Sequence, residues 1–245
     1  MLMAVVQSAV AVLGIASCRS PASPGGVVTR TFDFAQGAQG WEAGFADYPS
    51  GAEAFYELVA DYRALPASLA PGRSALYISG NNHSDDLFMF YKGQVAGLAP
   101  GARYDAELEI EIATDVPAGC GGVGGSPGES VYVKAGAGSI EPTTAVDGSG
   151  SVQVVGFDKG NQAVGGANAL VLGNVANSQP CELVDGVIVR RWEFKTLRAP
   201  ATLAVRADDQ GGVWLLAGTD SGFEATTSLY YTRVTVTLAA VTAAD

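Results

Sequence analysis

The only histidine of the chain, His83, lies in a polar stretch that ends in two adjacent aspartates just before an apolar run. Imidazole and carboxylate groups in one stretch can transfer protons or hold a metal ion. In an extended chain, however, neighbouring carboxylates point to opposite sides, which suits shared acid–base work poorly. Asn, Ser and Asp also bond readily to their own backbone in turns. We therefore expect no catalytic residue here, but a loop between strands whose side chains contact a ligand: Asn81, His83, Asp85 and Asp86.

Four loops share one composition, in which Asp, Asn or Glu stands beside Gly and Lys is rare: 81–86, 158–168, 207–212 and 218–227. Calcium takes about 6–8 oxygen ligands, including backbone carbonyls, and such loops can supply them. None of the loops has the ligand spacing of an EF-hand, so a site would have to be assembled from separate loops. We select Asp86, Asp220 and Glu224 as ligands of a structural calcium ion. The alternative, that the four loops are simply turns, stays open.

Aromatic side chains are the other candidates, because the apolar faces of sugar rings stack on Trp and Tyr. Trp41 and Tyr48 lie in Gly-rich, loop-like sequence beside acidic residues, and we expect both to contact a ligand. Trp192 and Trp214 lie within strand-like runs and are expected in the core.

Composition excludes one class of partner and favours one class of fold. The formal net charge is -11 at pH 7 and no cluster of Lys and Arg is present, whereas nucleic-acid binding needs such a cluster. Hydrophobic residues make up 48% and charged residues 16% of the chain, which is ample material for a core. With 32 glycines between short runs of Val, Thr and Tyr, the sequence predicts a turn-rich, all-β protein.

The start of the chain is an apolar run that ends in Ile15-Ala16-Ser17 before Cys18. It is too short to span a membrane comfortably. The pattern resembles the signal peptide of bacterial lipoproteins, in which an aliphatic and two small residues precede a cysteine that becomes lipidated. The resemblance implies a signal peptide over residues 1–17, a lipid on Cys18 and export to the cell envelope, with the lipid as the only membrane contact. Because no Lys or Arg precedes the run, an ordinary cleaved secretory signal is the alternative.

Export gives the other two cysteines, Cys120 and Cys181, a role. Both lie in loop-like sequence flanked by Gly or Pro, and outside the cytoplasm such a pair can form a disulfide. Zinc is the alternative, but two Cys and one His leave a tetrahedral site one ligand short unless a carboxylate completes it. We favour the disulfide.

After a flexible tether over residues 18–26, we expect one antiparallel β-sandwich over residues 27–240, with long Gly/Asn/Asp-rich loops. The stretch 53–66 fits both a helical and a strand pattern, and its β context favours a strand. The expected strands are Val27–Phe34, Ala54–Ala60, Ser74–Ser79, Leu87–Val95, Tyr104–Ala113, Ser130–Ala135, Ser151–Phe157, Ala169–Gly173, Ile188–Thr196, Ala201–Ala207, Val213–Gly218 and Leu229–Leu238.

The order of these segments resembles galactose-binding-like jelly rolls, which occur as carbohydrate-binding modules in secreted bacterial proteins. In that family a Leu-x-Pro-Gly-x-x-Tyr turn leads into a central strand, and residues 98–104, Leu-Ala-Pro-Gly-Ala-Arg-Tyr, match it. The final strand of the family usually carries a small acidic turn that helps to hold a structural calcium ion. Here the equivalent stretch, 230–233, is Tyr-Tyr-Thr-Arg, which departs from that pattern.

We therefore predict a surface-anchored, non-catalytic binding module that recognises a glycan or another component of the cell envelope, and no nucleic acid. The first alternative is a secreted glycan hydrolase or lyase that uses a carboxylate pair, such as Asp86 and Glu224, brought together by folding. The second is a structural envelope protein, whose sign would be a large exposed apolar patch.

Overall fold

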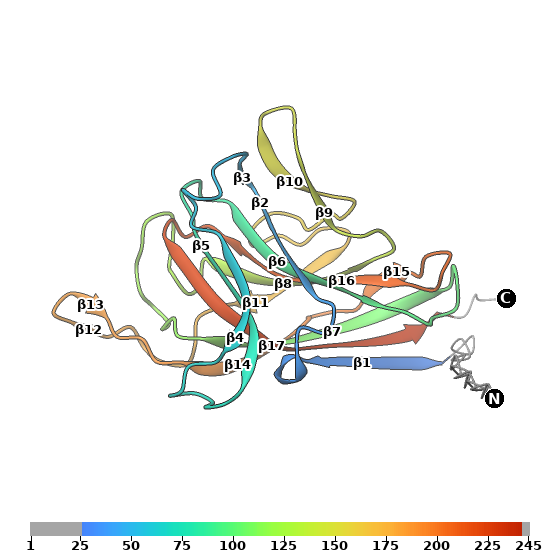
Figure 1. The fold of residues 1–245 in the computed structure, drawn as a ribbon, viewed down its shortest axis with the longest axis horizontal. Helices are drawn as coiled ribbons and strands as arrows, with labels where there is room; N and C mark the ends of the chain where they lie inside the picture. The colour runs from blue at the N-terminus through green and yellow to red at the C-terminus, as the bar shows by residue number, and fades with distance from the viewer. Residues whose placement is uncertain (1–25, 242–245) are drawn as a thin grey trace, which may run out of the picture.

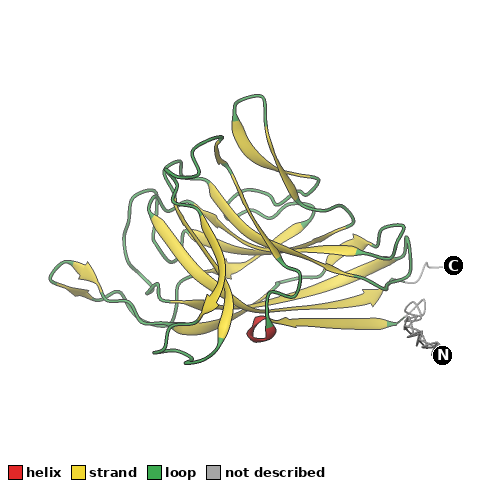
Figure 2. Cartoon of the chain, in the orientation of Figure 1, coloured by secondary structure: helices red, strands yellow, loops and turns green. Residues whose placement is uncertain are grey.

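The computed structural model describes residues 26–241. The predicted signal peptide, the lipidation site Cys18 and most of the tether lie outside the described residues. Nearly all regular structure is β-strand, with one short 3-10 helix, η1 (Phe34–Gln36), as Figure 2 shows. Among the described residues, no helix has the length and apolar character needed to cross a membrane.

Two antiparallel sheets form the sandwich that the sequence predicts (Figure 1). Sheet A has the order β14-β7-β17-β5-β4, with β1 paired to β17 and β15 paired to β7. Its strands are β1 (Val27–Asp33), β4 (Val59–Ala64), β5 (Ser74–Asn81), β7 (Arg103–Thr114), β14 (Glu193–Arg198), β15 (Leu203–Arg206) and β17 (Thr226–Ala240). Sheet B has the order β11-β8-β16-β6-β2. Its strands are β2 (Glu42–Ala46), β6 (Leu87–Val95), β8 (Val131–Gly138), β11 (Ala169–Asn174) and β16 (Val213–Ser221).

Two smaller sheets stand apart from the sandwich. The first joins β3 (Tyr48–Pro49), β10 (Ser151–Val155) and β9 (Thr143–Val146) above sheet B (Figure 1). The second is a projecting hairpin of β12 (Leu183–Val184) and β13 (Val187–Ile188). The predicted disulfide between Cys120 and Cys181 lies at the base of this hairpin and closes a 61-residue separation.

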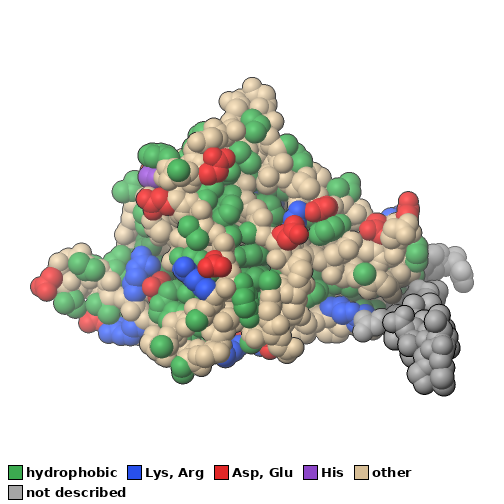
Figure 3. Space-filling view, viewed as in Figure 1, with side chains coloured by type: hydrophobic (Ala, Val, Ile, Leu, Met, Phe, Trp, Pro, Cys, Tyr) green, Lys and Arg blue, Asp and Glu red, His purple; other side chains and the backbone are tan. Residues whose placement is uncertain are grey.

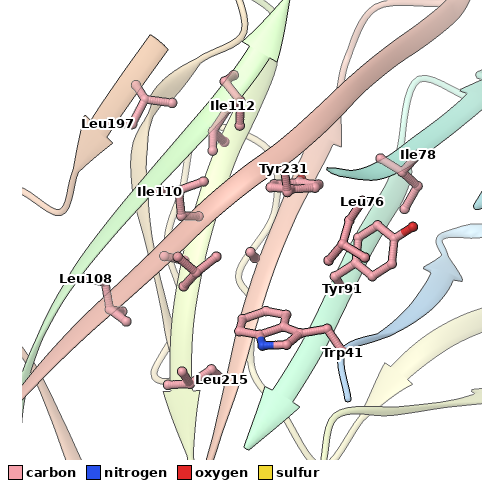
Figure 4. Packing of buried hydrophobic residues seen from close by; sticks show 14 of the residues in the cluster. Trp41, Leu76, Ile78, Tyr91, Leu108, Ile110, Ile112, Leu197, Leu215 and Tyr231 are labelled. Carbon is pink, nitrogen blue, oxygen red and sulfur yellow. The ribbon is translucent and has the colours of Figure 1, made fainter. Parts of the chain in front are cut away.

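Alternation along the strands decides which side chains form the core. On β7 the apolar residues Leu108, Ile110 and Ile112 are buried, while the glutamates between them point to the other face of sheet A. They pack between the sheets with β5, β6 and β17, and Figure 4 shows Trp41, Leu76, Tyr91 and others in the same cluster.

Sheet B buries a second, smaller cluster on its outer face, away from the main core. Its members come from β2, β6, β16, β11 and the loop after β10: Ala46, Phe88, Phe90, Phe157, Ala169 and Leu216. Gly136 and Gly138 on β8 allow this packing, because a Cβ at Gly136 would lie 2.7 Å from the ring of Phe157. The loop after β10 therefore lies directly on the outer face of sheet B.

The turn over residues 98–104 forms as the sequence predicts. Gly101 has a φ of 67°, and the backbone N–H of Ala102 donates to the carbonyl of Ala99. The hydroxyl of Tyr104 accepts from the N–H of Ala99 at 3.0 Å, which ties the turn to the start of β7.

Two predicted strands are misplaced. The expected strand Ala54–Ala60 is mostly turn, because Glu57 has a φ of 51°, and β4 begins only at Val59. The expected strand Ile188–Thr196 is interrupted after β13 and resumes as β14. The stretch 230–233 forms no turn at all but contains a β-bulge at Thr232 within β17.

Candidate functional site

The outer face of sheet B carries a buried cluster of opposite charges, formed by Asp47, Asp86, Lys134, Lys159 and Asp220. Lys134 on β8 lies opposite Gly218 on β16, so Asp220 is its diagonal neighbour two positions further along β16, and neither side chain is exposed. Nζ of Lys134 is 2.8 Å from Oδ2 of Asp220. Nζ of Lys159 is 2.7 Å from Oδ2 of Asp47 and 3.0 Å from Oδ2 of Asp220. Two ammonium groups thus neutralise most of the charge of three carboxylates.

The two lysines also fasten the loop that follows β10. Besides Asp220, Lys134 donates to the carbonyls of Lys159 and Val164 at 3.0 and 3.1 Å. Oδ2 of Asp220 further accepts from the backbone N–H of Gln162 at 3.0 Å. All three donors of the Lys134 ammonium are therefore used, which is what burial of an ammonium group requires.

Burial and neighbouring charge shift the pKa values of these groups in different directions. Burial lowers the pKa of Lys134, although Asp220 opposes the shift. Burial also acts to lower the pKa of Lys159, but Asp220 and Asp47 outweigh it and raise that pKa. For Asp47, burial outweighs the effect of Lys159 and raises the pKa.

An open cavity of about 390 Å³ lies beside this cluster. It is lined by carboxylates, amides and an ammonium group around two apolar side chains: Asp47, Asp86, Gln153, Val154, Phe157, Asp158, Lys159, Gly160 and Asn161. Strand β10 supplies Gln153 and Val154, and the loop after it supplies Phe157 to Asn161. The cavity thus joins segments that are more than 100 residues apart in the chain.

Asp86, like Asp47, has a raised pKa at this cavity. Burial, followed by the charges of Asp47 and Asp220, raises its pKa from 3.8 to about 6. Its Oδ1 is buried and has no hydrogen-bond partner among the described residues. Asp86 also lines the cavity, so its carboxylate group can accept a hydrogen bond from a ligand hydroxyl there.

The predicted calcium ligands are only partly brought together. Asp86 and Asp220 offer carboxylate oxygens within 4.8 Å of each other and of Asp47, but Glu224 is not in this group and is exposed. Glu224 instead lies beside Gly124, and its backbone N–H donates to the carbonyl of Val123, so the fold does not bring it to the other two carboxylates. The cluster also does not fit calcium, because the ammonium of Lys159 already lies between Asp47 and Asp220 where a cation would have to bind.

The loop between β5 and β6 is held by Asn82, which the sequence did not single out. Its amide donates to the carbonyls of Ser221 and Phe223 at 2.8 and 3.0 Å, and its oxygen accepts from the N–H of Ser84. Asp85 takes a φ of 58°, and its carbonyl accepts from the side chain of Gln162. The buried amide and the left-handed turn thus direct Asp86 into the cavity and leave Asp85 outside it.

The other residues predicted in this loop lie at the surface. His83 is exposed and stacks on Phe55 with ring centroids 4.1 Å apart, and Asn81 is the last residue of β5. Neither lines the cavity. His83 and Phe55, which is 64% exposed, form a separate aromatic pair at the edge of the molecule.

Trp41 and Tyr48, which the sequence predicts as ligand contacts, are both buried, and neither lines the cavity beside Asp86. Trp41 is 4% exposed and packs edge-on against Phe32 and Phe34, so its ring faces belong to the core. It fits there because Gly93 leaves room, where a Cβ would come within 2.4 Å of the indole. Tyr48 is 6% exposed and packs near Tyr56.

The expected burial of the other two tryptophans is also wrong in part. Trp192 and Trp214 are partly exposed. Trp214 alternates with the buried Val213 and Leu215 on β16 and so points to the outer face of sheet B. Its position in an apolar run gave no hint of this, because the run contains residues of both faces.

Ser126 lies in a motif that is typical of a nucleophilic serine, but His83, the histidine of the chain, does not contact it among the described residues. Residues 124–128 read Gly-Gly-Ser-Pro-Gly, which has G-x-S-x-G spacing. Ser126 lies in a turn and not between a strand and a helix, and its hydroxyl bonds to the carboxylate of Glu129. His83 is engaged with Phe55 instead. The arrangement is that of a structured loop.

Comparison with known proteins finds no matching family model and no matching curated protein. Among solved structures, the chain is similar to a carbohydrate-binding module of the β-sandwich superfamily with promiscuous specificity, at 11% identity and a TM-score of 0.38. That match covers 82% of this chain, and the chain spans 58% of that protein.

Two further similar structures are a carbohydrate-binding module that recognises mannan and one in complex with β-1,4-galactotriose. The first has 12% identity, a TM-score of 0.37 and coverage of 86% of this chain and 97% of the other. The second has 9% identity, a TM-score of 0.35 and coverage of 89% and 97%. At these scores the matches carry no argument about function, and the fold class rests on the strand pairing itself.

Proposed function

We propose that the protein is a non-catalytic carbohydrate-binding module that holds a neutral glycan in the cavity beside Asp86. The observation that carries the proposal is the lining of that cavity. Carboxylate and amide groups from Asp86, Gln153 and Asn161 can bond to sugar hydroxyls, while Val154 and Phe157 supply apolar contact. We further propose export and display at the cell surface through a lipid on Cys18, as the sequence pattern predicts.

The charge arrangement favours binding over catalysis. Asp220 is buried and its Oδ2 is bound by two lysines, and Asp47 is bound by Lys159, so ammonium groups hold both carboxylates in the charged form that ion pairing requires. Glu224, the expected partner of Asp86 in a hydrolase, does not line the cavity. One observation keeps the hydrolase as the alternative: Asp86, with a pKa raised to about 6, resembles the acid of such enzymes.

A glycan array tests the proposal, with protein that begins at Arg19 and is shown to be folded. Ligands found on the array are then titrated by calorimetry into the wild type and the variants Asp86→Asn and Gln153→Ala. Each variant should lose one or two hydrogen bonds and bind about 3–10-fold more weakly. The variant Glu224→Gln, changed at an exposed acid away from the cavity, should bind like the wild type.

Three results would contradict the proposal in different ways. Silence on a broad array would exclude the glycan. Equal binding by the cavity variants and the wild type would place the ligand elsewhere on the molecule. Release of shorter sugars from a bound oligosaccharide, lost in Asp86→Asn, would support the hydrolase.

A further inference from the structure

The outer face of sheet A carries a row of aromatic residues that runs across its strands. In the strand register, Tyr77 on β5 lies opposite Tyr230 on β17, which lies opposite Ala113 on β7, which lies opposite Phe194 on β14. This row is on the outer face because Tyr231, the neighbour of Tyr230, pairs with core residues of the other face. The small residue Ala113 interrupts the row between two aromatic rings.

Trp192 lies over this row just before β14 begins. Its ring centroid is 5.4 Å from that of Tyr230, which is 5.0 Å from that of Tyr77. Trp192 is partly exposed and Phe194 is 39% exposed, so both present ring surface to solvent. The row and Trp192 thus form an aromatic strip in which Tyr230 is buried, at 6% exposure, and ring surface reaches solvent at Trp192 and Phe194.

Two exposed arginines, Arg63 and Arg73, stand on the same strip. The guanidinium carbon of Arg63 is 3.3 Å from the ring centroid of Tyr77 and 5.9 Å from that of Tyr230. The guanidinium carbon of Arg73 is 5.3 Å from the ring centroid of Phe194. Stacking on a ring fixes the plane of a guanidinium group and leaves its N–H edge free.

Neither arginine has an acidic partner among residues 26–241. By contrast, Arg198 pairs with Glu109 and Arg233 pairs with Glu111 on the same face of the sheet. Figure 3 shows Lys and Arg side chains over the part of the molecule where β4 and β14 lie, with both acidic and apolar side chains among them. Two unpaired arginines on an aromatic strip are a notable exception in a chain of net charge -11.

We propose that this strip, formed by Arg63, Arg73, Tyr77, Trp192, Phe194 and Tyr230, is a second binding surface, for a saccharide whose rings carry carboxylates. The guanidinium fork matches a carboxylate in shape and charge, and the accessible rings of Trp192 and Phe194 match the apolar faces of sugar rings. The surface lies on the sheet opposite the cavity, so the proposal does not depend on the cavity ligand.

Two acidic residues, Asp61 and Glu111, lie near the strip, and among the described residues only Asp61 adds an unpaired negative charge to it. Asp61 lies opposite Tyr77 and is exposed, yet it forms no ion pair with Arg63, so the strip keeps two positive groups against one negative group. Glu111 is occupied by Arg233 and by the hydroxyl of Thr232. The local charge is therefore positive, and a dianionic stretch of sugar chain is complementary to it.

The test uses oligogalacturonate, which has one carboxylate on each ring, and its methyl ester, in which the same rings are neutral. Binding to the folded chain is followed by NMR titration or by affinity electrophoresis. The acid should bind and the ester should bind more weakly. Arg63→Gln and Arg73→Gln should each weaken binding of the acid about threefold, and the double variant about tenfold.

Controls separate this surface from general electrostatics and from the cavity. Arg30→Gln, changed at an exposed arginine on β1, and Asp86→Asn should bind oligogalacturonate like the wild type. Trp192→Ala should weaken binding of the acid, whereas poly-glutamate should not compete for the surface. No binding of the acid, equal binding of acid and ester, equal loss in Arg30→Gln, or full competition by poly-glutamate would overturn the proposal.

Discussion

Nζ of Lys134 lies 2.8 Å from Oδ2 of Asp220, and both side chains are completely buried between sheet B and the loop after β10. Removal of one partner leaves a buried charge without its main counterion, which typically costs about 3–5 kcal/mol. Because Lys159 also contacts Asp220, we expect Lys134→Met to destabilise the fold by about 3 kcal/mol. Urea unfolding measures this loss. Lys92→Met, which breaks the partly exposed pair with Glu141, should cost less than about 1 kcal/mol.

The same substitution has a local effect that a global loss of stability would not produce. Lys134 holds the carbonyls of Lys159 and Val164, and Asp220 holds the N–H of Gln162. Relative to the wild type at the same temperature, Lys134→Met should accelerate hydrogen exchange at the amide of Gln162 more than at the amides of β7. Equal acceleration of both would show that the lysine stabilises the whole sandwich and does not specifically fasten the loop.

Asp86 predicts how stability depends on pH. Its pKa is about 6 in the folded protein against an ordinary value of 3.8, so the folded state binds the proton more tightly. The contribution of Asp86 to the free energy of unfolding is therefore largest at acid pH, and this contribution is lost as the pH rises from about 4 to about 6. Asp86→Asn lacks this loss and should be more stable than the wild type above pH 6, by about 1 kcal/mol after allowance for partial exposure.

Thermal unfolding of both proteins between pH 4 and pH 8 measures the difference. The two curves should diverge across the window from pH 4 to pH 6 and run parallel above it. A constant difference at every pH would mean that Asp86 does not titrate in this window. As the pH rises and Asp86 ionises, affinity for a glycan should increase, because the ionised carboxylate is the better acceptor of a hydrogen bond from a sugar hydroxyl.

Much of the fold follows from local patterns that the sequence displays. The strict alternation over residues 104–113 predicts a half-buried strand, and β7 is that strand. The Pro-Gly turn before it forms, and so does the disulfide between Cys120 and Cys181. Each of these depends on neighbours in the chain or on a small number of possible pairings, which is why sequence reasoning suffices.

The cavity could be predicted only in part, because it depends on contacts between distant segments. The carboxylates of Asp86 and Asp220 mark them as candidates in the sequence, but the lysines that neutralise them, Lys134 and Lys159, carry no local signal. Lys134 lies within an apolar strand, and nothing in its neighbours shows which face it occupies or that Asp220 lies across from it. Burial of Trp41 likewise follows from the space at Gly93, 52 positions away.

Binding of calcium remains a prediction without an assigned site. One location that can be tested is the charge cluster around Lys159. Lys159 lies between Asp47 and Asp220, so a divalent cation at this place would be repelled and would have to displace an ammonium group. Addition of calcium should therefore shift the unfolding temperature of Asp47→Asn and of the wild type equally. A calcium shift present in the wild type and absent in Asp47→Asn would place the ion in the cluster.

The disulfide gives the last prediction, because it joins Cys120 to Cys181 at the base of the β12–β13 hairpin. The N–H of Cys181 also donates to the carbonyl of Ala118, so the bridge and the backbone hold the same two segments together. Cross-linking residues 61 positions apart reduces the entropy of the unfolded chain and is expected to stabilise the fold by about 4 kcal/mol. The double variant Cys120→Ser, Cys181→Ser should lose about 3–4 kcal/mol in urea unfolding. Reductant should destabilise the wild type by a similar amount and leave the variant unchanged, whereas a loss below about 1 kcal/mol in the variant would show that the sandwich folds equally well without the bridge.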